Sequence, residues 1–132
     1  MACAACTSSS PSTDVACANV SAECKPQYDP PTYDTIFTKI LKPTCATGTG
    51  TCHTADSAKG GLVFVDASQS HAMLLGKDGG RARVKPMDPS CSLLIERLTS
   101  TDPSFHMPPG PSSISNGELC TIVQWIAAGA KR

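Results

Sequence analysis

The sequence contains few aromatic residues. Its 132 residues include one Trp, two Tyr and three Phe. A chain of this length has room for one domain with one modest hydrophobic core, and so few large side chains make that core thin. A second domain is therefore not expected, and the single core needs further stabilisation.

An excess of charge of either sign is also missing. Eleven Lys and Arg residues balance eleven Asp and Glu residues. A neutral chain has no overall field that would draw it onto nucleic acid or an anionic membrane. We therefore expect neither nucleic acid nor a charged membrane surface as a partner.

Long apolar runs are absent from the sequence. No stretch approaches the roughly 20 apolar residues that a membrane-spanning helix needs, so no membrane span is expected. The start of the sequence, MACAACTSSSPSTD, also lacks the charged and apolar regions of a signal peptide. For an exported protein, we therefore expect the signal to be missing from this sequence.

Cysteine, in contrast, is abundant, with eight residues in the chain. So many cysteines in a short chain with a thin core favour disulfides and an oxidising compartment. We expect an exported protein that is periplasmic or anchored in the outer membrane. Small residues precede Cys6, as they precede the acylated cysteine of a bacterial lipoprotein, so Cys6 is a candidate lipid anchor. A disordered exported tail explains the same residues equally well.

Two regions follow from the distribution of residue types. Residues 1–31 carry four cysteines among Ser, Pro, Ala and Thr without helical or strand periodicity. We interpret them as an N-terminal tail or tether, held in part by a disulfide between Cys17 and Cys24. Residues 32–132 are expected to form the folded domain.

Three helices are predicted from their end signals and apolar spacing. Thr32 can cap a helix over residues 33–41, which Pro43 would end. Asp88 is a suitable N-cap for a helix over residues 89–98. Ser115 and Glu118 form a capping box for the last helix, and Gly129 suits the position just after its end.

The connections between these helices are long and irregular. We expect an extended run at residues 62–65, a short helix at residues 68–75 and a glycine-rich turn at residues 76–80. Four prolines within residues 99–114 exclude regular structure there. Helices with little alternating strand pattern predict a small all-α domain. Cys91 and Cys120 lie in the first turns of two predicted helices, where a disulfide between them would join those helices.

Cys45, Cys52 and His53 form the main chemical motif. Cys52 and His53 match the end of the c-type haem attachment signature C-x-x-C-H, but Cys45 gives the longer spacing C-x6-C-H. An imidazole beside a cysteine on a loop can bind iron while the thiol bonds to the edge of the macrocycle. If residues 45–52 were helical, the Cα atoms of Cys45 and Cys52 would be about 10.5 Å apart, too far for a disulfide. Either bond therefore requires a bend, which Gly48 and Gly50 allow.

Met107 is the candidate for the second iron ligand. A thioether in a proline-stiffened loop is preorganised, and a His and Met ligand pair raises the potential of haem in cytochromes c. The neighbouring His106 is the minority alternative for this position. Arg81, Arg83 and Lys85 are candidates to hold the haem propionates or to meet a partner, although a solvated basic turn is an equally good interpretation.

Other chemistries fit the sequence less well. Cysteine ligands of structural zinc sites are typically two to four residues apart, and a second matching pair is missing. Blue copper uses Cys, Met and two His residues, but on a β-sandwich that the helical pattern does not support. Nucleophilic catalysis lacks a glycine-rich nucleophile turn and a poised base. We therefore do not expect acyl-transfer chemistry. An iron with two side-chain ligands would have no open position for a substrate, so no enzyme is expected.

The ordered motifs of residues 33–132, about three quarters of the chain, resemble the planctomycete-type cytochrome c domain. Besides the aromatic-bearing first helix, Cys52 and His53, the resemblance rests on KGGL at 59–62, PMDPSCSLLIERL at 86–98, MPPG at 107–110 and WIAAGA at 125–130. It implies a class I cytochrome c-like fold with long loops around one haem c, which is bonded to Cys45 and Cys52. It also implies His53 and Met107 as the axial ligands, and crossed first and last helices.

The sequence departs from that family at three places. The attachment motif is longer, Met87 stands where glycine usually follows Pro86, and Cys91 and Cys120 are additional. The long motif leaves three possibilities open: two thioethers, one thioether at Cys52, or a haem-free protein with a disulfide between Cys45 and Cys52. The expected function is single-electron transfer to a redox partner protein. The alternative is a haem-free, disulfide-stapled binding or structural module.

Overall fold

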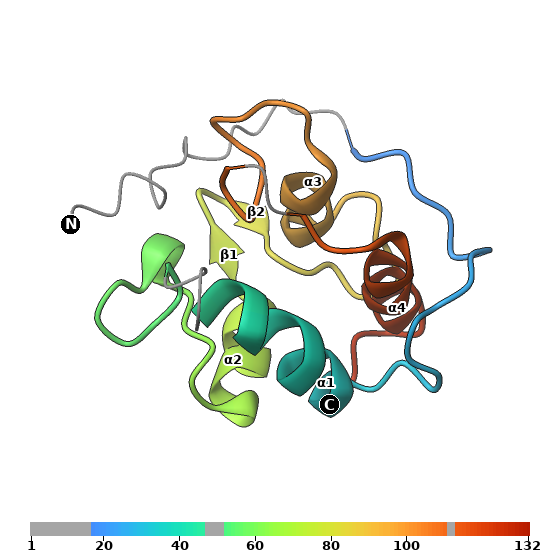
Figure 1. Cartoon of the computed structure of the whole chain (residues 1–132), viewed down its shortest axis with the longest axis horizontal. Helices are drawn as coiled ribbons and strands as arrows, with labels where there is room; N and C mark the ends of the chain where they lie inside the picture. The colour runs from blue at the N-terminus through green and yellow to red at the C-terminus, as the bar shows by residue number, and fades with distance from the viewer. Residues whose placement is uncertain (1–16, 47–51, 111–112) are drawn as a thin grey trace.

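The structure is a computed structural model that describes residues 17–46, 52–110 and 113–132. The predicted lipid anchor at Cys6 and the predicted bend at Gly48 and Gly50 lie outside these residues. Figure 1 shows the elements around one core. In chain order they are α1 (Tyr33–Ile36), the π-helix η2 (Phe37–Ala46), the 3-10 turn η3 (Lys59–Gly61), α2 (Ala67–Leu74), β1 (Lys77–Asp78), β2 (Arg81–Ala82), α3 (Leu93–Thr99) and α4 (Asn116–Ala127).

The prediction of an all-α domain is wrong, because the glycine-rich turn is part of a β-hairpin. Strands β1 and β2 pair antiparallel, with Lys77 opposite Ala82 and Asp78 opposite Arg81. Gly79 and Gly80, which connect the strands, have φ angles of 57° and 82°. A two-residue hairpin turn with positive φ at both positions favours glycine, which adopts these angles without strain. The domain is therefore small and mixed, with four α-helices and this two-stranded sheet among the described residues.

The first helix begins as predicted but ends later. The Thr32 side chain accepts a hydrogen bond from the amide of Thr35, which caps the helix start. Beyond Ile36 the helix continues as the π-helix η2, which contains Pro43 and extends to Ala46. The predicted end at Pro43 is wrong, and Cys45 lies in the last turn of this helix.

Of the two other predicted helices, α4 begins where predicted and α3 does not. Ser115 and Glu118 form the expected capping box of α4, and Gly129 follows its end with a φ of 111°. Helix α3, however, begins at Leu93. Asp88 accepts a hydrogen bond from the amide of Cys91 at 3.2 Å, so its side chain closes a preceding turn instead of capping the helix.

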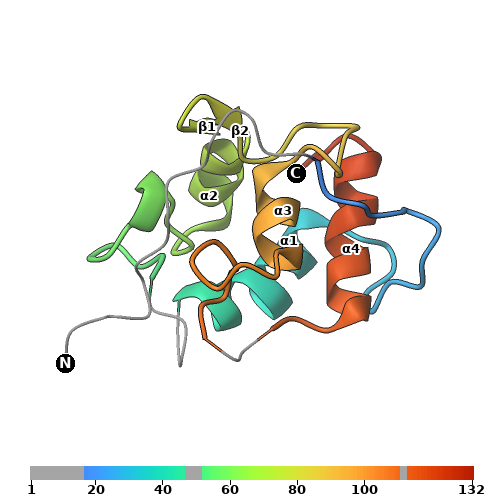
Figure 2. The same ribbon diagram turned by 90° about the horizontal axis from the view of Figure 1, so that it is seen from above.

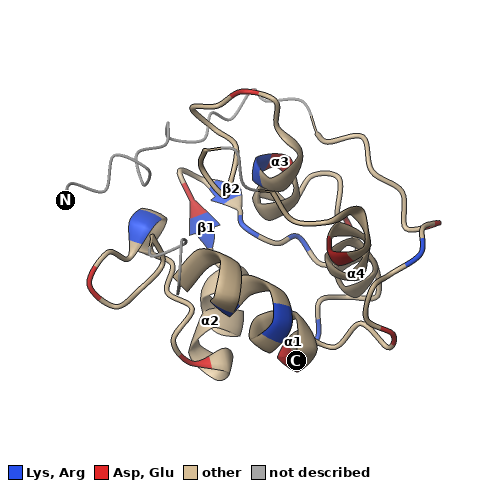
Figure 3. Ribbon diagram, in the orientation of Figure 1, with Lys and Arg blue, Asp and Glu red and all other residues tan. Residues whose placement is uncertain are grey.

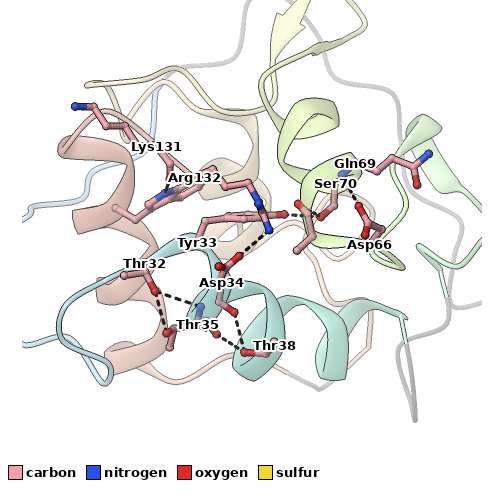
Figure 4. A network of polar contacts seen from close by, with 12 residues as sticks. Thr32, Tyr33, Asp34, Thr35, Thr38, Asp66, Gln69, Ser70, Lys131 and Arg132 are labelled. Carbon is pink, nitrogen blue, oxygen red and sulfur yellow. Dashed lines mark hydrogen bonds and ion pairs between the residues drawn. The ribbon is translucent and has the colours of Figure 1, made fainter.

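The core lies where α1 packs against α2 and α4 (Figure 2). The Tyr33 and Trp125 rings are 5.2 Å apart at their centroids, and both side chains are buried. Tyr33 also hydrogen-bonds through its hydroxyl to Ser70 of α2 at 2.7 Å (Figure 4). The chain end is held nearby, because Arg132 forms an ion pair with Asp34 at 3.0 Å.

Charged residues are spread over several elements of the ribbon (Figure 3).

Residues 17–31 run beside α4 as an extended strap (Figures 1 and 2). Disulfides join Cys17 to Cys91 and Cys24 to Cys120. The predicted pairings, Cys17 with Cys24 and Cys91 with Cys120, are therefore wrong. Both predictions paired cysteines within one region, whereas the strap crosses α4 and brings each of its cysteines to a partner far along the chain.

Backbone contacts hold the strap along its length. The amide of Gln27 donates to the carbonyl of Gly117 at 2.9 Å, and the amide of Tyr28 donates to the Thr121 hydroxyl at 3.2 Å. The Gln124 side chain donates to the carbonyl of Cys24 at 2.9 Å. At least these residues of the predicted tail are thus integrated with the folded domain.

Candidate functional site

The backbone of His53 lies against that of Cys45. The His53 amide donates to the Cys45 carbonyl at 3.0 Å, although eight positions separate the two residues. In an α-helix the same bond joins residues four positions apart, which is the distance from the first cysteine to the histidine in C-x-x-C-H. Cys45 and His53 are therefore joined by the backbone hydrogen bond that the first cysteine and the histidine of a helical C-x-x-C-H motif would form, although this motif is four residues longer.

The two cysteines of this motif are in different states. Cys52 is disulfide-bonded, whereas Cys45 is a free cysteine. A disulfide between Cys45 and Cys52, one of the three possibilities that the long motif left open, is therefore not formed in this structure. Burial raises the pKa of the Cys45 thiol to about 12, so this thiol remains protonated at neutral pH.

His53 is buried, with 7% of the residue exposed. Its Nδ1 lies 3.0 Å from the carbonyl oxygen of Leu62. Because a carbonyl only accepts, Nδ1 must carry the proton, and in the neutral ring the lone pair is at Nε2. A metal-binding histidine is commonly oriented by such a bond from its other nitrogen.

The surroundings of His53 favour its neutral form. Burial is the main cause that lowers the pKa of the ring, and the charges of Arg97 and Arg83 lower it further. The carbonyls of Leu62 and Lys59 act in the opposite direction. A neutral imidazole is the form that can bind a metal.

Turn η3 and the residues just after it bind the backbone of Cys52 and His53. The amide of Lys59 donates to the Cys52 carbonyl at 3.0 Å, and the amide of Phe64 donates to the His53 carbonyl at 2.8 Å. Arg83 binds the Gly60 carbonyl at 2.6 Å. Gly60 has a φ of 62°, which other residues rarely adopt. These contacts fix both the position of the Cys52 and His53 pair and the turn that follows it.

Met107 lies on the irregular segment after α3, where it is half-buried. Its amide donates to the carbonyl of Arg97 at 2.9 Å. The Arg97 guanidinium donates to the Phe105 carbonyl at 3.1 Å and lies 4.3 Å from the centroid of the Phe105 ring. His106 is also half-buried, and its amide donates to the Asp102 carbonyl at 2.8 Å.

Arg97 contacts the segment that carries Met107 and also affects the pKa of His53. Its backbone and side chain contact the segment that carries Met107, and its charge lowers the pKa of His53. The sequence analysis did not select this residue. A signal was present, because an arginine within the apolar helix segment LLIERL needs polar partners when it is buried.

The three basic residues near the hairpin have different surroundings. Arg83 donates to backbone carbonyls of Met73 and Gly60, and the exposed Lys85 pairs with Asp88 at 2.7 Å. Arg81 forms an ion pair with the buried Glu96. Within the described part of the chain, Nη1 of Arg81 and Oε1 of Glu96 are buried without a hydrogen-bond partner. Arg81 therefore retains a buried donor that an anionic group could use.

No group of three or more His, Cys, Asp or Glu residues gathers as a metal site within residues 17–46, 52–110 and 113–132. Within the same ranges, no helix is long and apolar enough to cross a membrane.

One comparison with known proteins finds a similarity. No curated protein and no solved structure matches the chain. Residues 50–111, however, match the family model described as Planctomycete cytochrome C. The matched segment includes Cys52, His53 and Met107 and begins after Cys45. The resemblance to the planctomycete-type cytochrome c domain is therefore confirmed, on the evidence of this segment.

Proposed function

We propose that this protein transfers single electrons through one covalently bound haem c. In this proposal Cys45 and Cys52 would hold the haem through thioether bonds, and the side chains of His53 and Met107 would bind its iron. The observation that carries the proposal is the 3.0 Å bond from the His53 amide to the Cys45 carbonyl. It gives a long attachment motif the backbone contact expected of the short one.

The side chains around this motif suit a c-type haem in two further respects. His53 is buried and neutral, and the Leu62 carbonyl orients the ring so that Nε2 is the nitrogen available to iron. The buried Nη1 of Arg81, which lacks a hydrogen-bond partner among the described residues, is a donor suited to a propionate. When bound, the haem would supply an iron centre that takes up and releases one electron.

The state of Cys52 sets a condition for this function. A cysteine in a disulfide has no thiol to add to a haem vinyl group, and Cys52 is disulfide-bonded here. Reduction of that disulfide must therefore precede attachment at Cys52. Cys45 already has a free thiol, so attachment at this residue needs no prior reduction.

The proposed function includes a partner and a location. An iron bound by both His53 and Met107 would have no open position for a substrate, so the proposed role is that of a carrier and not of an enzyme. Its partner is another redox protein, and neither nucleic acid nor a membrane span is involved. We place the protein in the periplasm, or on the outer membrane through a lipid at Cys6, because its disulfides require an oxidising compartment.

A haem-free, disulfide-stapled binding or structural module is the second candidate. The disulfide of Cys52 favours it, since this bond occupies a residue needed for attachment. The two disulfides of the strap also stabilise the domain without a cofactor.

Expression of the full chain beside a haem-maturation system separates the two candidates. The first predicts Soret and α/β absorption bands that sharpen on reduction, and a denatured mass increased by one haem. Absence of both signals would contradict it. Alkylation of the same sample without reductant gives the complementary result, because the second candidate predicts that Cys52 is protected.

Replacement of the ligands tests the assignment within the first candidate. Met107→Ala should remove the Met-to-iron charge-transfer band of the oxidised protein, whereas His106→Ala should leave it. If the band persists in Met107→Ala, the assignment of Met107 as ligand is wrong.

A further inference from the structure

The loop that carries Met107 is attached to a single residue of α3 from two sides. We define it as the Met107 loop, residues 100–107. The Met107 amide donates to the backbone carbonyl of Arg97 at 2.9 Å. The guanidinium of the same arginine donates to the Phe105 carbonyl at 3.1 Å. Arg97 therefore contacts the loop on both sides of His106.

The ring of Phe105 adds a third contact. Its centroid lies 4.3 Å from the guanidinium carbon of Arg97, within the range in which a cation is attracted to an aromatic face. Arg97 is itself buried, with 8% of the residue exposed. Such contacts are strongest where water is excluded, so the buried guanidinium holds the loop more firmly than a surface residue would.

The remainder of the loop is ordered by Asp102. Its carbonyl accepts from the amides of Phe105 at 3.0 Å and His106 at 2.8 Å, and its carboxylate accepts from the Ser104 amide at 2.8 Å. These bonds lie within the loop and shape it as a unit. The bonds that join the loop to α3 within residues 17–46, 52–110 and 113–132 are those of Arg97.

We propose that Arg97 is the positioning residue of the Met107 loop, fixing the backbone at Met107 relative to α3. The part of this inference that concerns iron rests on the proposed function, whereas the part that concerns the loop does not.

Amide hydrogen exchange tests the loop directly in the haem-free, disulfide-intact protein. Arg97→Met keeps a long side chain but removes the guanidinium and leaves the backbone acceptor of the Met107 amide in place. We expect the Met107 amide to exchange about tenfold faster or more in this variant. Lys85→Met, which removes an exposed ion pair elsewhere, is the matched control and should leave the Met107 rate unchanged.

Two further variants keep the test decisive if Arg97→Met folds poorly. Phe105→Leu removes the aromatic face while Arg97 stays in place, and should accelerate exchange at Met107 by a smaller factor. Arg97→Lys keeps the charge without the planar fork, and should restore part of the protection. An unchanged Met107 exchange rate in folded Arg97→Met and in Phe105→Leu would overturn the proposal.

The haem-loaded protein provides a second readout. Arg97→Met should weaken or abolish the Met-to-iron charge-transfer band, and the double variant with His106→Gln should recover it if His106 displaces Met107. A band of full strength in Arg97→Met would also overturn the positioning role. If the wild-type chain binds no haem, the proposed function fails, and the exchange measurements alone decide the role of Arg97.

Discussion

Nδ1 of His53 donates to the carbonyl of Leu62 across 3.0 Å, and the ring that forms this bond is buried. The bond fixes which nitrogen carries the proton. Burial also keeps the ring neutral, because it lowers the pKa of His53 below 6.5. Together these effects give the domain a stability that depends on pH.

The free energy of unfolding of the haem-free protein should fall as the pH is lowered below about 6.5. In that range the unfolded chain protonates His53 while the folded chain does not, so the unfolded state binds more protons. Above it both states are neutral and His53 contributes no slope. Urea unfolding at about pH 5 and pH 7.5 measures the difference, which His53→Gln should reduce.

The matched control is His106→Gln, which removes an imidazole from the Met107 loop and should leave the pH dependence in place. An equally steep decline in His53→Gln and the wild type would show that other groups cause it.

Cys45 and Cys52 should contribute differently to haem attachment. Cys52→Ala should lower the yield of covalently attached haem more than Cys45→Ala does, because the cysteine adjacent to the iron ligand is lost. Cys45→Ala should retain a covalent haem with a single thioether, and the α band of its pyridine haemochrome should shift from that of the wild type. An identical band in Cys45→Ala and the wild type would mean that Cys45 is not attached.

Gly117→Ala should destabilise the protein even though alanine favours helices over glycine by about 1 kcal/mol. A Cβ atom at this position would lie 3.1 Å from Cβ of Gln27 and 3.4 Å from its backbone nitrogen. Gln27 cannot easily move, because its amide binds the Gly117 carbonyl and the Cys24–Cys120 disulfide holds the strap beside it.

A double-mutant cycle in urea tests this cause. In the Cys24→Ala/Cys120→Ala background the strap can yield, and Gly117→Ala should become neutral or stabilising. We expect a coupling free energy above about 0.5 kcal/mol, and strictly additive effects would refute the explanation.

Met87→Gly should stabilise the protein by about 0.5–1 kcal/mol. Met87 has a φ of 71° and is 70% exposed, so the side chain gains little from burial while the backbone is strained. The amide bond to the Ile126 carbonyl does not depend on the side chain. Thermal unfolding should show a higher midpoint for Met87→Gly and little change for Met87→Ala, which retains Cβ.

The positive φ angle of Met87 also explains why the family pattern has glycine at this position. Glycine is the residue expected after Pro86, and the positive φ at Met87 is a conformation that glycine adopts without strain. The resemblance to the family predicted glycine here, and the backbone angle gives the physical reason that glycine suits the position.

Local signals in the sequence predicted the helices better than the pairing of distant segments. Ser115 and Glu118 interact within one turn, so their capping box could be recognised directly. The hairpin at Gly79 and Gly80 was missed because each strand has two residues, too short for an alternating pattern. Its glycine pair was the available signal.

In the candidate site, too, the sequence predicted neighbouring residues better than contacts between distant ones. Cys52 and His53 are adjacent, and the motif they form could be selected without a structure. The contact between Cys45 and His53 joins the backbones of residues eight positions apart, which no local pattern predicts, and the role of Arg97 depends on tertiary burial. The disulfide partners of Cys17 and Cys24 likewise depend on the path of the strap across α4.

The pairing of Cys17 with Cys91 and of Cys24 with Cys120 has a consequence for proteolysis. Cleavage of any single peptide bond between Cys24 and Cys91 would leave one fragment with Cys17 and Cys24 and the other with Cys91 and Cys120. Both disulfides would then join the two fragments. A protease that cuts once in this region would therefore release no piece of the protein until a reductant is present.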